Sequence, residues 1–166
     1  MKACGRCNFC CKVMAIDELA KPFGVWCPHA RPGQGCAIYG EHPASCRAFA
    51  CLWLTEDGLP DAYRPDRTKV VLTAEDEAQP RLIANCEPAN PLAWAQEPIY
   101  SLLKARARET WGTGSVVLAK AGLRLWLITP NADMDLGEVE TRSPVLVEQD
   151  PLGEIRVTVQ PPRPAA

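Results

Sequence analysis

Long apolar runs are missing from this chain of 166 residues. No stretch approaches the ~20 consecutive apolar residues that a helix needs to cross a bilayer, so we expect no membrane association. The N-terminus also lacks the apolar segment of a secretory signal, because a cysteine motif begins almost at once. We therefore expect a cytoplasmic protein.

The familiar motifs of nucleotide-binding and hydrolytic enzymes are missing as well. The chain has no glycine-rich loop of the kind that cradles phosphate groups, and no motif argues for a Ser/His/Asp set. It also contains no internal repeat. If the protein catalyses a reaction, the chemistry must come from a metal centre.

A strong excess of charge is absent, since the formal net charge is −2. Residues 1–51 nevertheless carry six Lys or Arg against three Asp or Glu, a balance of +3. A basic segment often indicates an anion-binding face. Here, however, metal-bound thiolates would supply negative charge for these cations to offset, and we expect no nucleic-acid partner.

Cysteine, in contrast, is abundant at one end of the chain. Eight of the nine cysteines fall within the first 51 residues. In a reducing compartment, clustered cysteines are metal ligands more often than disulfides. We therefore predict a metal ion or cluster as the partner of this segment, bound by Cys4, Cys7, Cys10, Cys11, Cys27, Cys36, Cys46 and Cys51.

The spacing of the cysteines leaves the metal open. Zinc takes four ligands, commonly from C-x2-C-like pairs. The run Cys4-x2-Cys7-x2-Cys10 also matches three ligands of a bacterial ferredoxin loop, so an iron–sulfur cluster is equally compatible. Cys10 and Cys11 are adjacent, and in extended backbone their side chains would point in opposite directions. Eight cysteines then indicate two four-ligand sites or one polynuclear centre.

The full pattern resembles a known family. Its parts are Cys4-x2-Cys7-x2-Cys10-Cys11, Cys27-Pro28, Gly35-Cys36-Ala37-Ile38-Tyr39 and His42-Pro43-x2-Cys46-Arg47-x-Phe49-x-Cys51. This is similar to the CxxCxxCC cysteine-cluster family (YkgJ-like), described as a zinc- or iron-chelating domain. The resemblance covers about residues 1–54. His42 stands where the family more usually has arginine, so no anion-binding role is carried over to it.

The expected fold is α+β, with a loop-rich cysteine segment packed on a small antiparallel sheet and one main helix. Residues 1–54 have few apolar side chains, and we expect metal binding to nucleate their folding. We expect residues 66–160 to form the α+β body, because alternating or helical spacing of apolar residues marks its regular elements. The expected elements are strands at 69–74, 81–86, 116–118 and 123–128, a helix at 99–111, and a hairpin of 145–147 with 155–159. Residues 161–166 are predicted to be a disordered tail.

Three further groups receive simpler interpretations. Cys86 lies alone in an apolar strand and is expected in the core rather than at a metal. His29 and His42 are expected beside the metal ligands or at the surface. The acidic residues Asp133, Asp135, Glu138 and Glu140 are expected in a solvated loop.

The sequence is compatible with more than one function. A structural or metal-handling role for the cysteine cluster is the leading hypothesis. The alternatives are a cluster-dependent redox or group-transfer enzyme, and a thiol–disulfide redox protein. The related family includes proteins linked to lysine methylation of flagellin, but no separate cofactor-binding motif for that chemistry is present here.

Overall fold

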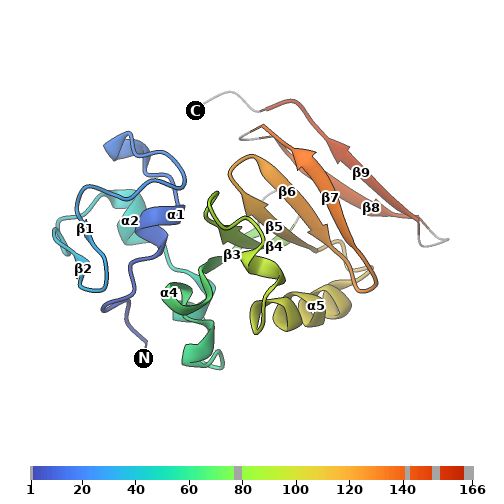
Figure 1. The fold of residues 1–166 in the computed structure, drawn as a ribbon. Coiled ribbons are helices and arrows are strands. Elements are labelled where there is room, and N and C mark those ends of the chain that lie inside the picture. The colour runs from blue at the N-terminus through green and yellow to red at the C-terminus, as the bar shows by residue number, and fades with distance from the viewer. Residues whose placement is uncertain (1, 77–79, 141–142, 151–153, 163–166) are drawn as a thin grey trace.

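Short elements and extended loops make up the first part of the chain. The computed structural model describes residues 2–76, 80–140, 143–150 and 154–162 (Figure 1). Up to residue 69 its elements are α1 (Cys10–Val13), η1 (Asp17–Leu19), β1 (Ala30–Arg31), β2 (Gly35–Cys36), α2 (Ala44–Ala48), α3 (Leu52–Thr55), η2 (Asp61–Tyr63) and α4 (Pro65–Thr68). The predicted paucity of regular structure in this segment is confirmed.

Longer strands and the main helix follow. They are β3 (Val70–Asp76), β4 (Pro80–Cys86), η3 (Ala93–Ala95), α5 (Ile99–Thr110), β5 (Val116–Ala121), β6 (Arg124–Ile128), β7 (Asp133–Glu138), β8 (Val145–Gln149) and β9 (Ile155–Val159). The predicted α+β class is confirmed, with α5 as the main helix. Of the predicted tail, residues 161–162 have no assigned helix or strand, and 163–166 lie outside the described residues.

The central sheet has the strand order β3-β4-β5-β6-β7. It is mixed rather than wholly antiparallel as predicted, because β4 and β5 run parallel while the other neighbouring pairs are antiparallel. The reason is the helix between them. A helical crossover such as the one containing α5 brings the chain back to the same end of the sheet, which a tight hairpin cannot do.

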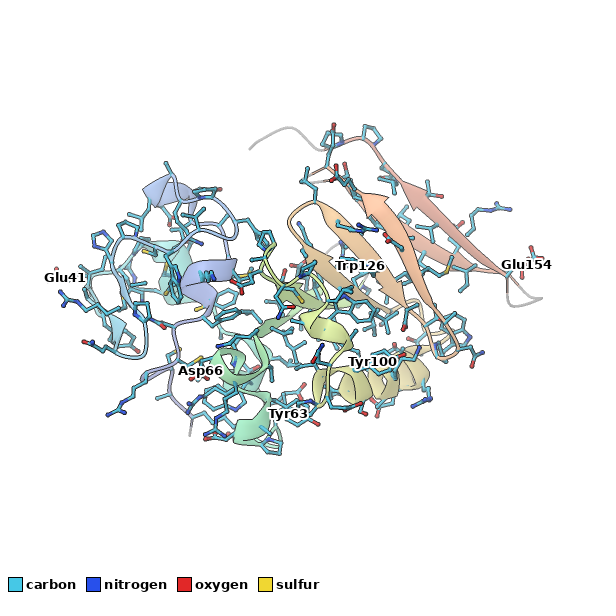
Figure 2. The ribbon with its side chains drawn as sticks, viewed as in Figure 1. Glu41, Tyr63, Asp66, Tyr100, Trp126 and Glu154 are labelled. Atoms are coloured by element: carbon cyan, nitrogen blue, oxygen red, sulfur yellow. The ribbon has the colours of Figure 1, made fainter. Side chains whose placement is uncertain are left out.

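The sheet buries side chains on both faces. Alternate residues of one strand point to opposite faces, so Leu127 packs with β8 and β9 in one apolar cluster. Trp126 and Ile128 pack in the larger cluster, which also contains side chains of α5. Strand β6 is therefore buried on both faces, with Trp126 (labelled in Figure 2) on the face that meets the larger cluster. Figure 1 shows the β8–β9 hairpin lying beyond β7, away from the N-terminal segment.

Helix α5 has the predicted extent and packing. Ile99, Leu103 and Ala107 recur at four-residue spacing and are at most 3% exposed. This spacing places them on one face of the helix, against the sheet. Helix α5 ends at Thr110, shortly before Gly112, whose φ of 76° is left-handed.

The main apolar core is shared by the two parts of the chain. It includes Phe9, Val13 and Trp53 from the N-terminal segment together with Val70 and Leu103 from the body. Burying such a side chain contributes about 1.5–3 kcal/mol. The cysteine segment therefore does contribute apolar side chains to the core, and it packs on the body as one compact unit.

The acidic stretch predicted as a loop is an edge strand instead. β7 pairs with β6, and two of its carboxylates meet cations of neighbouring elements. Asp133 accepts hydrogen bonds from Lys104 at 2.9 Å and from the Tyr100 hydroxyl at 2.9 Å. Asp135 pairs with Arg124. The loop was predicted from the carboxylates alone. Met134 and Leu136 alternate with them and pack against the apolar cluster that contains Leu127, as side chains of a strand do.

Candidate metal centre

The first cysteine motif folds as a turn that leads into a short helix. The Cys7 N–H donates to the Cys4 carbonyl at 2.7 Å, and the Cys11 N–H donates to the Asn8 carbonyl at 3.0 Å. Cys10 and Cys11 are therefore the first two residues of α1. The premise that they lie in extended backbone was wrong. Neighbouring side chains on a helix are separated by a smaller angle than those on an extended strand, which point in opposite directions.

Of the second pair of cysteines, Cys27 precedes a small hairpin and Cys36 lies on it. The Cys27 N–H donates to the Cys11 carbonyl at 2.9 Å. Cys36 lies on β2, opposite Ala30 of β1. Strand β2 is limited to Gly35 and Cys36. The amide of Asn8 donates to the carbonyls of Arg31 and Gly35, at 2.9 and 3.2 Å, which fixes the hairpin to the first loop.

The last two cysteines do not share a helix. Cys46 lies in α2, whereas Cys51 immediately precedes α3. α2 is attached to η1 by Glu18, whose carboxylate accepts hydrogen bonds from the Ser45 N–H and hydroxyl at 2.9 and 2.7 Å. Glu18 therefore fixes the helix that carries Cys46 to the segment that follows the first cysteine motif.

These segments bring all eight predicted cysteines to one cavity of about 220 Å³. Most of the other lining side chains are apolar, among them Met14, Ile16 and Phe49. His29 and His42 also line the cavity. Cys86 does not line it, since it is 0% exposed in β4 and belongs to the main core as predicted.

Burial decides the protonation of several of these thiols. It raises the pKa of Cys4, Cys7, Cys46 and Cys51, because an apolar surrounding disfavours a thiolate. Backbone N–H groups act in the opposite direction at Cys7 and Cys51. A metal ion would therefore have to displace protons from these thiols on binding.

Cys10 and Cys11 form a coupled pair. The two thiols hydrogen-bond to each other, which raises the pKa of Cys10 and lowers the pKa of Cys11 to about 7. The ammonium of Lys21 lowers the pKa of Cys11 further. The cavity thus contains one thiol that deprotonates readily beside one that keeps its proton.

Two lysines that sequence reasoning did not single out lie within this framework. Lys21 is only 4% exposed, and its ammonium donates to the carbonyls of Lys12, at 3.0 Å, and Met14. Burial lowers the pKa of Lys21, while the neighbouring cysteines Cys11, Cys27, Cys10 and Cys46 raise it. The expectation that cations of this segment lie near the thiols thus holds for Lys21.

Lys2, like Lys21, donates from its ammonium to backbone carbonyls. Its ammonium donates to the carbonyls of Trp53, at 2.9 Å, Glu56, and Leu59, at 2.6 Å. These carbonyls lie at and beyond the C-terminal end of α3, where the helix leaves acceptors without internal donors. The only sequence signal for both lysines was the basic balance of residues 1–51.

The donor set fits a metal centre by its chemistry. Thiolates are the ligands that zinc and iron–sulfur clusters prefer, and eight cysteines surround one cavity. Among the residues that the structure describes, however, no group of three or more His, Cys, Asp or Glu is already arranged to hold an ion. The sulfur atoms would therefore have to move closer together on binding.

Comparison with known proteins assigns no role to these residues. No family model, curated protein or solved structure matches the chain. In the part of the chain that the structure describes, no helix is long and apolar enough to cross a membrane.

Proposed function

We propose that this protein binds a metal through the eight cysteines of residues 4–51, as zinc or as an iron or iron–sulfur centre. The observation that carries the proposal is the selective placement of the cysteines around one cavity. Eight cysteines from distant parts of the segment line one cavity, while the ninth, Cys86, is buried in the sheet. Thiols distributed merely as small apolar side chains would have no reason to gather around one cavity in this way.

The role of the centre is structural or in metal handling. All-cysteine coordination closes the sphere of a zinc ion and leaves no position for a substrate. The segment also consists largely of loops and short helices, which a metal would fasten together. The resemblance of residues 1–54 to the zinc- or iron-chelating CxxCxxCC family supports the same function.

The cytoplasm is the proposed location. All nine cysteines are free thiols, and a reducing compartment keeps them available as ligands. Nucleic acid and membranes are not proposed as partners.

Metal analysis of protein purified without oxygen tests the proposal. We expect zinc or iron in stoichiometric amount, with visible absorption if the centre is an iron–sulfur cluster. C86A serves as the matched cysteine control and should retain the metal. Metal-free protein with an unchanged fold and freely titratable thiols would contradict the proposal. Reversible oxidation of a cysteine pair in such a protein would favour thiol–disulfide chemistry instead.

A further inference from the structure

We propose that the cavity contains two metal sites rather than one centre. This inference rests on the proposed function and assigns its ligands. The first site is formed by Cys4, Cys7, Cys10 and Cys51. The second site is formed by Cys11, Cys27 and Cys46, with Cys36 as the remaining thiol of the cavity to complete it.

The first group is assembled against the body of the protein. The turn closed by the hydrogen bond from the Cys7 N–H to the Cys4 carbonyl brings these two residues together. Cys51 belongs to the main core, and Cys10 packs against that core. Lys2 fixes the start of the chain to the carbonyls around the end of α3, the helix that follows Cys51. Contacts with α3 and with the main core therefore bring the segments of this group together.

The second group is assembled away from the main core, around Lys21. The Cys27 N–H donates to the Cys11 carbonyl, which joins the segments carrying these two cysteines. Lys21 donates to the carbonyls of Lys12 and Met14, next to Cys11 in sequence. Cys46 of α2 lines the same cavity as Cys11 of α1.

Two further contacts complete this arrangement. Glu18, close to Lys21 in sequence, binds the backbone N–H and hydroxyl of Ser45, the neighbour of Cys46. The β1–β2 hairpin begins just after Cys27, since the Ala30 N–H donates to the Cys27 carbonyl at 3.0 Å. Ala30 in turn pairs with Cys36 across the hairpin. A short connection of this kind keeps Cys36 within the same small unit as Cys27.

Electrostatic interactions between the thiols follow the same division. Cys51 lies within electrostatic range of Cys4, Cys7 and Cys10. Cys46 interacts instead with Cys11 and Cys27. Some interactions cross the division: Cys4 interacts with Cys11, Lys21 interacts with Cys10, and the adjacent thiols of Cys10 and Cys11 on α1 hydrogen-bond to each other. The two sites therefore lie next to each other and meet at this pair.

Four-ligand coordination gives the division a physical reason. Zinc takes four ligands in structural sites, so eight thiols supply two closed shells. The positive charge of Lys21 lies beside the second group and offsets part of the charge of its thiolates. A single polynuclear centre, by contrast, would make every cysteine contribute to the same binding event.

Paired substitutions on the full-length chain distinguish these arrangements. The protein is loaded with Zn²⁺ alone under anaerobic conditions, and bound zinc per chain is measured after removal of the excess. The wild type should bind about two zinc ions, and C10S or C11S about one each. The double variants C10S/C51S and C11S/C46S should still bind about one, because each pair removes ligands of one site only. C10S/C46S should bind almost none.

Several results would overturn the division. They are equal zinc content in the three double variants, loss of all zinc in C10S alone, or a wild type that binds only one ion. Far-ultraviolet circular dichroism and amide exchange in α5 show whether each variant is folded, and Co²⁺ spectra of the single variants report the thiolates that remain. A wild type that binds no metal would contradict the proposed function itself, which separates the two failures.

Discussion

Gly24 lies against the ring of Pro88 so closely that a β-carbon on Gly24 would be 2.6 Å from Pro88 Cδ. The φ of Gly24 is also left-handed, at 78°. Gly24 belongs to the cysteine segment, whereas Pro88 follows β4 of the sheet. This contact, together with the shared core, places the cysteine segment directly on the body.

Replacing Gly24 by alanine should therefore destabilise the protein. The methyl group meets Pro88, and the left-handed backbone is unfavourable for alanine, so we expect a loss of about 2–4 kcal/mol in the free energy of unfolding. The measurement is chemical denaturation of the metal-loaded protein. G33A is the matched control, because Gly33 has a φ of 73° but no atom within 4 Å of its would-be β-carbon. Equal losses in the two variants would show that the contact with Pro88 has no energetic consequence.

Removing the charge of Lys2 should weaken the attachment of the N-terminus to α3. K2M leaves three carbonyl groups without their ammonium donor, and we expect a loss of about 1–3 kcal/mol in the free energy of unfolding. R6M is the control, since Arg6 is an exposed cation beside Cys7. A K2M variant as stable as R6M would show that the Lys2 contacts contribute nothing measurable.

Removing the metal should loosen the cysteine segment before the sheet. A strong chelator should abolish amide protection in β1, β2 and α2, which contribute none of the buried side chains of the main core. Protection in α5 should persist, because Ile99, Leu103 and Ala107 are buried in the main core without any metal present. Simultaneous loss in α5 and α2 would mean that the shared core depends on the metal. Unchanged protection in both would show that metal does not order this segment.

The thiol of Cys86 should be unreactive in the folded protein, whereas the reactivity of the other cysteines should depend on metal. Burial raises the pKa of Cys86 to about 12, so its thiol is protonated at neutral pH. Iodoacetamide should leave Cys86 unmodified in the folded chain and should modify several cysteines of residues 4–51 once the metal is removed. Peptide mass spectrometry before and after chelation gives the result directly. Rapid modification of Cys86 in the folded protein would contradict its placement in the core.

The sequence by itself determined the α+β class, the main helix and the group of eight cysteines. These features are local, because they depend on apolar periodicity or on the spacing of one residue type. The Ile99, Leu103 and Ala107 face, for example, needs no knowledge of distant segments. The burial of Cys86 was also readable, since a single thiol within an apolar strand matches a core position.

The tertiary structure decided which distant segments meet. It made β4 and β5 parallel, turned the acidic stretch into β7, and placed Cys10 and Cys11 on a helix. It also buried Lys21 beside the thiols, whereas the sequence did not show which of the basic residues would lie there. Strand direction, burial and pairing depend on contacts between residues far apart in the chain, and local patterns of sequence do not record these contacts.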